Sequence, residues 1–300
     1  MRRILKYAGV LAGAIALLAI VGVAGLYAWT SNELAAKSPL PGHAFTAPTD
    51  SASVVRGEHV VRAIGKCGDC HGQDLGGDTL LDDPAMGLIY SPNLTRGAGG
   101  IGGTYTDAQW EAAIRHGLAA DGRRLVVMPS NEYQFLSDED LGTIIAYLRT
   151  VPAVDRTGPT QRVGPLARAL YAGGVFPMFP AKAVTHGDEV VAAVAIDSTV
   201  TYGKYLGDVG CSGCHGVTYG GGAIPGGPPD WPQPATLTPT GIGHYTQEGF
   251  ITALRTGKRP DGTEINPFMP IAATRQMTDV EIVAVYKYLR TLPARPFGSR

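Results

Sequence analysis

All four cysteines of this 300-residue chain lie in two copies of one pattern, C-x-x-C-H, at Cys67–His71 and Cys211–His215. Each copy places two thiols and one imidazole within a few consecutive residues, so any fold must bring these groups to one spot. The copies lie 144 positions apart, and a chain of this length has room for two ordinary domains. We therefore expect one copy in each of two domains.

The C-x-x-C-H pattern is the attachment sequence for c-type haem. The two thiols bond to the porphyrin vinyl groups as thioethers, and the histidine that follows coordinates the iron from one side. The sequence therefore predicts two covalently bound haem c groups. The attachment residues are Cys67, Cys70 and His71 in the first half, and Cys211, Cys214 and His215 in the second.

Three other uses of paired cysteines compete with haem. Zinc ribbons join two cysteine pairs across about 15–20 residues, whereas 140 residues separate the pairs here. Disulfides form outside the cytoplasm, but they leave the histidine after each pair unexplained. A thioredoxin-like redox pair needs a βαβ setting, which the local sequence lacks. Two copies, each followed by histidine, favour haem over all three.

An internal repeat covers much of the remaining sequence. The segment GIGGTYTDAQWEAAIRHGLAADGRRLVVMP from Gly100 matches GIGHYTQEGFITALRTGKRPDGTEINPFMP from Gly241, and the match continues from Leu136 and Met277. The offset is 140 or 141 residues. Because one C-x-x-C-H motif precedes each copy, the repeat supports one haem domain in each half.

Helices are expected at matching places in the two halves. Apolar residues at helical spacing follow Ser137 and Thr278, which form capping-box patterns with Asp140 and Glu281. Other expected helices are Asp107–His116, Gln247–Thr256, and segments around Val54–Ile64 and Val200–Gly207. Gly/Pro-rich loops join them, without sustained strand alternation. The expected fold class is mostly α, with two tandem domains after one N-terminal transmembrane helix.

Met128 and Met269 are the candidate second ligands of the two irons. They occupy equivalent positions in the repeat, and each is followed by proline. The alternative is that each methionine only packs beside the haem. Other candidates lack a counterpart of the same type in the other half, and we expect ordinary core, loop or surface roles for them: His59, His116, Met86, Met178 and Met277.

The N-terminal region predicts a membrane anchor. Tyr7–Trp29 is a run of 23 residues without a charge, long enough to cross a hydrocarbon core of ~30 Å. Arg2, Arg3 and Lys6 precede it, so the positive-inside rule places the rest of the chain on the periplasmic side of the inner membrane. A cleaved signal peptide is the competing interpretation, but its apolar stretch is usually only about 7–15 residues long.

These features divide the chain into five parts. They are an anchor (1–29), a tether (30–50), a first cytochrome c domain (51–154), an inter-domain linker (155–197) and a second cytochrome c domain (198–300). The linker is apolar enough that we expect it to pack on the domains.

Composition fits domains whose cores a cofactor completes. The chain contains 41 glycines and 22 prolines, more than average usage, which predicts loop-rich domains with modest apolar cores. A large apolar macrocycle would supply the missing core. The formal net charge is −1, and no basic patch indicates a nucleic-acid partner.

With these motifs in place, the chain resembles membrane-anchored c-type cytochromes, and in pattern the cytochrome c subunits of periplasmic alcohol, gluconate and related dehydrogenases. The resemblance rests on RGEHVVRAIGKCGDCHG, GLIYSPNLTRGAGGIGGTYT, LVVMPSNEYQFLSDEDLGTIIAYLRTVP and their second-half counterparts. It implies a class I cytochrome c fold in each half, in which Gly57 meets Tyr147 and Gly203 meets Tyr288. Those subunits typically carry three haem motifs, whereas this chain carries two.

The sequence favours an electron-transfer protein over an enzyme, and it predicts no catalytic residue. Histidine and methionine ligands together leave no vacant position on the iron. We expect a relay of single electrons between redox protein partners, namely a dehydrogenase, a quinol-oxidising complex or a terminal oxidase. The alternative is a di-haem enzyme: a peroxidase, which must open a site on one iron, or a thiosulfate-oxidising cytochrome, which needs a further cysteine.

Overall fold

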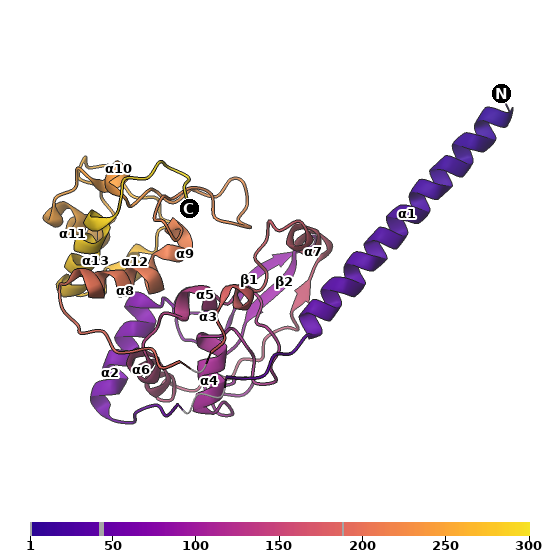
Figure 1. Ribbon diagram of the computed structural model, residues 1–300. Coiled ribbons are helices and arrows are strands. Elements are labelled where there is room, and N and C mark those ends of the chain that lie inside the picture. The colour runs from indigo at the N-terminus through magenta and orange to yellow at the C-terminus, as the bar shows by residue number, and fades with distance from the viewer. Residues whose placement is uncertain (1, 42–44, 188) are drawn as a thin grey trace.

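The computed structural model describes residues 2–41, 45–187 and 189–300. The protein is mostly α-helical, and one long helix projects from a body that holds both halves of the repeat (Figure 1). Parts of the predicted anchor, tether and linker, at positions 1, 42–44 and 188, lie outside the described residues.

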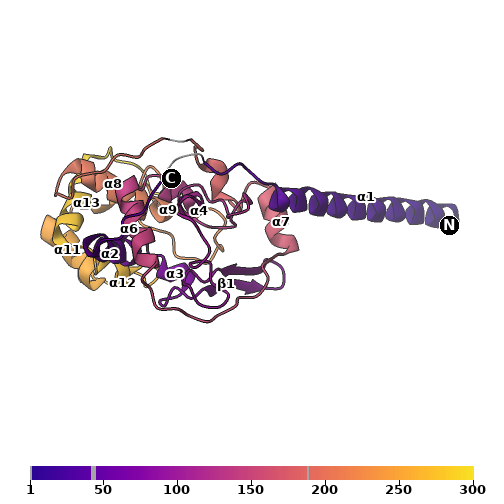
Figure 2. The same ribbon diagram turned by 90° about the horizontal axis from the view of Figure 1, so that it is seen from below.

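The projecting helix, α1, spans Arg2–Ala35. Among the described residues it is the one helix long and apolar enough to cross a membrane, and both views show it leading away from the body (Figures 1 and 2). It continues six residues beyond the predicted anchor. The extension is helical because its residues pack on the linker: Trp29 stacks on Tyr171 with ring centroids 5.3 Å apart, and Thr30 is fully buried.

The two halves contain matching series of helices. The first half has α2 (Ser51–His59), the π-helix η1 (Val60–Ile64), α3 (Gly68–His71), α4 (Asp107–Ile114), α5 (Ser130–Tyr133) and α6 (Asp138–Leu148). The second half has α8 (Val200–Gly210), α9 (Ser212–His215), α10 (Pro239–Ile242), α11 (Gln247–Thr256), α12 (Ile271–Thr274) and α13 (Asp279–Thr291). The predicted helices are confirmed, with ends that differ by a few residues.

The closing helices begin differently. Thr278 and Glu281 form the complete capping box that the sequence predicts at the start of α13. At the start of α6 the Ser137 hydroxyl accepts from the Asp140 backbone N–H, but the Asp140 carboxylate does not bond back. It bonds Arg56 and Tyr205 instead, so this predicted capping box is only half formed.

In each half the first and last helices cross at a glycine. A Cβ at Gly57 would lie 1.9 Å from the Thr143 carbonyl oxygen and 2.9 Å from the Tyr147 Cβ. A Cβ at Gly203 would lie 1.9 Å from the Ala284 oxygen and 2.9 Å from the Tyr288 Cβ. The predicted glycine–aromatic pairs are therefore confirmed, and no other residue fits either crossing without moving backbone.

A small antiparallel sheet is present that the sequence did not predict. Its order is β1 (Asp78–Asp83), β2 (Gly87–Ser91) and β3 (Arg162–Val163). β2 alternates buried and half-buried residues over only five positions, too short a run to identify from periodicity. β3 comes from the linker, so the pairing is non-local. The sheet has no counterpart in the second half of the described chain.

The linker packs on the body, as expected. It contributes β3, α7 (Pro165–Ala172) and the 3₁₀-helix η2 (Pro180–Ala183). Phe176, Met178 and Phe179 are buried against Ile89 of β2 in a cluster of their own. The main core is a second cluster that continues from one domain into the other, since buried residues of η1, α6, α8 and α13 all belong to it. The two domains therefore form one packed body.

Candidate functional site

The C-x-x-C-H residues form one short helix in each half, α3 and α9. Each helix ends at a glycine with positive φ, 78° at Gly72 and 80° at Gly216. This turn directs the next residues away, so the histidine imidazole is the last side chain on its helix. The histidine of each motif is 7% exposed.

A backbone carbonyl holds each of these histidines in the same way. The Nδ1 of His71 lies 2.8 Å from the Pro92 oxygen, and the Nδ1 of His215 lies 2.7 Å from the Ala235 oxygen. Burial lowers the pKa of both imidazoles, which favours the neutral form. A neutral ring whose Nδ1 donates to a carbonyl presents Nε2 as a ligand, an arrangement common at metal sites.

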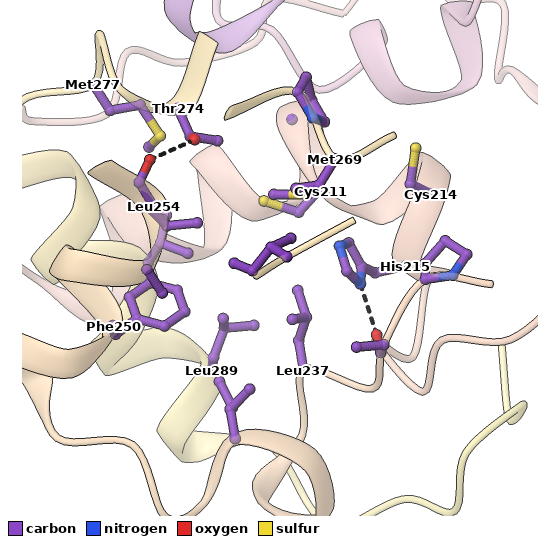
Figure 3. Close-up of a pocket in the computed structure, with 18 of the residues that line it drawn as sticks. Cys211, Cys214, His215, Leu237, Phe250, Leu254, Met269, Thr274, Met277 and Leu289 are labelled. Atoms are coloured by element: carbon purple, nitrogen blue, oxygen red, sulfur yellow. Dashed lines mark hydrogen bonds between the residues drawn. The ribbon is translucent and has the colours of Figure 1, made fainter. Parts of the chain in front are cut away.

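Each motif faces an apolar cavity. Figure 3 shows Cys211, His215 and Met269 around the cavity of the second half, with Leu237, Phe250 and Leu289 on its walls. In the first half the equivalent cavity is lined by Cys67, Cys70, His71, Leu94, Trp110 and Met128. All eight predicted site residues therefore line a cavity. In each half, the two cysteines and the histidine of the motif line the same cavity as the predicted methionine.

Met128 and Met269 line the walls of their cavities, and their role as iron ligands stays a prediction. Met277 also lines the second cavity, although the sequence suggested no role there. Its repeat counterpart Leu136 lines the first cavity in the same way. Because a leucine performs the equivalent task, packing accounts for Met277, whereas methionine recurs at the position of Met128 and Met269 in both halves.

The rival residues lie elsewhere. His59 bonds the carboxylate of Glu281, and His116 lies with its Nδ1 3.2 Å from that of His186. Met178 and Met86 belong to the separate apolar cluster that the linker forms with Ile89 of β2. None of these four residues lines either cavity.

Zinc and disulfide bonding do not fit the geometry of the described residues. No group of three or more His, Cys, Asp or Glu side chains among them could hold a metal ion. Burial raises the pKa of Cys67 to about 12 and of Cys211 to about 11, whereas zinc binds thiolates. No disulfide joins these cysteines, which lie on the walls of the two apolar cavities.

An amphiphilic macrocycle does fit. The cavity walls are mostly aliphatic and aromatic. In the first cavity the Nε1 of Trp110 and the Oη of Tyr90 are buried, and neither has a hydrogen-bond partner within the described part of the chain. Such donors suit a ligand that is apolar overall but carries acceptors such as carboxylates.

Comparison with known families settles what these two units are. Residues 200–293 match the model of the family described as "Cytochrome c", and residues 52–148 match that of "Cytochrome C oxidase, cbb3-type, subunit III". Each half of the chain is a cytochrome c domain. The two cytochrome c domains carry two covalently bound haem c groups.

The relatives of this chain include cytochrome subunits of dehydrogenases. The fructose dehydrogenase cytochrome subunit of Gluconobacter japonicus is 31% identical over 83% of this chain and 55% of that protein. The cytochrome c subunit of the Gluconobacter oxydans quinone alcohol dehydrogenase is 28% identical over 86% and 58%. A diheme cytochrome of Cereibacter sphaeroides is 26% identical over 95% and 98%. The chain thus spans a little over half the length of the two dehydrogenase subunits.

A cluster of buried polar groups joins the two cytochrome c domains. Arg56 donates to Asp140 at 2.8 Å and 3.0 Å, and to Glu281 of the other domain at 3.2 Å. The Tyr205 hydroxyl donates to Asp140 at 2.7 Å, and His59 Nε2 lies 2.8 Å from a Glu281 oxygen. We call these residues, with Tyr202, the interface cluster. No local sequence pattern could reveal this cluster, because its paired residues lie from 65 to 225 positions apart along the chain.

The interface cluster has approximate twofold symmetry. Arg56 and Tyr202 each precede a helix-crossing glycine, and Asp140 and Glu281 occupy the same position in α6 and α13. Arg56 bonds Asp140 within the first domain, as Tyr202 bonds Glu281 within the second. Across the interface, His59 meets Glu281 as its counterpart Tyr205 meets Asp140. This reciprocity is the mark of an isologous contact.

Proposed function

We propose that this protein relays single electrons between redox partners outside the cytoplasmic membrane, to which α1 anchors it. The observation that carries the proposal is the pair of equivalent cavities, each lined by a C-x-x-C-H motif and one Met-Pro methionine. When bound, a haem c supplies an iron that gains and loses one electron. We assign His71 and Met128 as the iron ligands of the first domain, and His215 and Met269 as those of the second.

The protein's own residues serve this function by keeping each site rigid and dry. The Pro92 and Ala235 carbonyls fix the imidazole orientations, and apolar walls exclude water. A ligand sphere that changes little between oxidation states suits electron transfer better than catalysis. We therefore propose a carrier or a carrier subunit and not an enzyme.

Contacts at the end of α1 support a retained anchor over a cleaved signal peptide. Glu33 accepts from the Tyr171 hydroxyl at 3.0 Å and pairs with Lys182. Arg168 lies over the Tyr27 ring, 4.6 Å from its centroid. Cleavage just after Trp29 would remove Tyr27 from these contacts and would shorten α1, the helix that positions Glu33, to a few residues. We propose the periplasmic side of the inner membrane as the location, with residues 51–154 and 198–300 as the two cytochrome domains.

The names of the relatives suggest the electron donor. We propose a membrane-bound dehydrogenase, with a quinol-oxidising complex or a terminal oxidase as alternative partners. The test adds the full chain, purified in mild detergent with both haems attached, to membranes from a source strain that lacks it. Fructose, ethanol or gluconate should then restore both haem reduction and oxygen uptake.

Matched controls separate this proposal from its rivals. Membranes without substrate should leave the haems oxidised, and quinol alone should reduce them only if a quinol-oxidising complex is the donor. Reduced protein should bind carbon monoxide slowly. Rapid binding would reveal an open iron site and favour a di-haem enzyme, and reduction by none of these donors would refute the relay.

A further inference from the structure

Equivalent residues of the two motifs meet where the domains touch. Lys66 immediately precedes Cys67, and Gly210 immediately precedes Cys211. The Nζ of Lys66 donates to the carbonyl oxygen of Gly210 at 2.5 Å. One side chain of the first domain therefore links the two attachment segments directly, and its charge enters the second domain.

Local backbone structure explains why Lys66 reaches so far. Ten positions separate Gly57 from Cys67, but only eight separate Gly203 from Cys211. The two additional residues widen the end of the helix into η1, where the Gly65 N–H bonds the Val60 oxygen. Lys66 follows with a φ of 52°. A Cβ on Gly210 would lie 3.2 Å from the Ile64 oxygen, so glycine permits this approach.

The contact makes the two cavities unequal. Ala63, Ile64 and Lys66 of the first domain line the cavity of the second. The described residues around the first cavity all fall between 65 and 161, so the second domain contributes none of them. The first domain thus completes the site of the second, and the reverse does not hold.

We propose that Lys66 is a positioning residue of the second haem site, where its ammonium raises the reduction potential of the haem attached at Cys211 and Cys214. Oxidised iron carries one more positive charge than reduced iron, so a nearby cation disfavours the oxidised form. When the protein holds a single electron, that electron is therefore expected to reside more often on the haem of the second domain. This inference rests on the proposed relay function and gives that relay a direction.

Lys66 lines both cavities, but its ammonium is bonded beside the second attachment segment. Its Nζ donates to the Gly210 oxygen at 2.5 Å and to the Ile64 oxygen at 3.3 Å. Ile64 itself lines the second cavity and not the first. These contacts favour a stronger influence of the charge on the second site.

Glu132 provides a charge of opposite sign at the same contact. Its carboxylate accepts from the Gly213 backbone N–H, and a Cβ on Gly213 would lie 1.9 Å from its Oε1. Its repeat counterpart is Ala273, so the second domain has no carboxylate at the equivalent position. Glu132 should lower the potential that Lys66 raises. The two residues thus offer opposite tests of one site.

The experiment is an optical redox titration of the full chain with both haems attached, without any partner. Lys66→Gln keeps a hydrogen-bond donor but removes the charge, and it should lower the midpoint of the second domain more than that of the first. Glu132→Gln should raise the same midpoint. Lys66→Arg keeps the charge and should restore the wild-type values. The transition that moves in Met269→His assigns the second domain.

Lys287→Gln is the matched control. Lys287 also donates to a carbonyl, that of Ser198 at 2.8 Å, but it lines neither cavity, so both midpoints should stay in place. Equal shifts of both midpoints in Lys66→Gln, or no shift with haem content and melting temperature retained, would overturn the proposal. If Gln misfolds, Lys66→Met gives the same test. Because no partner is present, failure here leaves the relay itself untouched.

Discussion

The two cytochrome domains have similar residues in their interiors but different residues on the surfaces where they meet. The glycine crossings, the attachment motifs and the Met-Pro pairs recur in both domains. At the interface, by contrast, the first domain has Arg56, His59 and Lys66 at positions where the second has Tyr202, Tyr205 and Gly210. Two copies of each basic residue would place like charges together around the pseudo-twofold axis. Divergence there is what allows the halves to pack.

The prediction with the largest expected effect tests whether the two domains fold independently of each other. Gly57→Val or Gly203→Val forces a Cβ to within 1.9 Å of a carbonyl oxygen, which should cost more than about 3 kcal/mol of stability. Haem content per chain and thermal unfolding are the readouts. Because the core is continuous between domains, each variant should impair both haem sites.

Gly103→Ala is the control for these variants. A Cβ there would meet no atom closer than 3.9 Å, so stability and haem content should stay near those of the wild type. Loss of only one haem in either valine variant would show that the domains fold separately, despite their common core.

The second prediction concerns the ligand that the two domains are expected to share. Met128→His and Met269→His should each lower one midpoint potential and leave the other nearly unchanged, because a His/Met pair gives a higher potential than two histidines. Optical redox titration provides the measurement. Met277→Leu should move neither potential, since Leu136 fills the equivalent place. A methionine whose replacement leaves both transitions in place is not a ligand.

How far the sequence predicts this molecule depends on the range of each interaction. The attachment helices and the Met-Pro positions follow from local motifs and the repeat, and the glycine crossings follow from the resemblance to class I cytochromes c. The three-stranded sheet does not, because Arg162–Val163 joins it from a distant part of the chain. The partners of Asp140 could not be predicted either. Its spacing from Ser137 predicts a capping residue, whereas in the structure its carboxylate accepts from Arg56 and Tyr205.

The third prediction concerns the loss of stability when acid protonates Glu281 in the interface cluster. Burial opposes the charge of Glu281, but bonds from His59 and Thr278 and the charge of Arg56 prevail, so its pKa falls from 4.5 to about 2. A lowered pKa stabilises the fold above the unfolded-state value, and this stability is lost as pH falls through the folded-state value. Between pH 4.5 and 2, unfolding free energy should drop by about 3 kcal/mol from this group alone.

Denaturant unfolding across that pH range measures the effect. Glu281→Gln should be destabilised by about 3 kcal/mol at neutral pH, because it loses the charge that His59 and Arg56 stabilise, and its stability should vary less with acid. An unchanged pH profile in Glu281→Gln would mean that another carboxylate carries the acid dependence. Asp279→Asn provides a control on the same helix, since that carboxylate pairs with Arg255 and is mostly exposed.

The smallest expected effects compare the two tyrosines that stand where the first domain has Arg56 and His59. Tyr205→Phe removes a 2.7 Å bond to the buried Asp140 carboxylate, which should cost about 1.5–2 kcal/mol. Tyr202→Phe removes only 3.3 Å contacts with Glu281 and Arg56, and Glu281 keeps its bonds from His59 and Thr278. Its cost should therefore be under about 1 kcal/mol. Urea unfolding of both variants ranks them, and the reverse order would mean that the 3.3 Å contacts of the Tyr202 hydroxyl contribute more than the 2.7 Å bond of the Tyr205 hydroxyl.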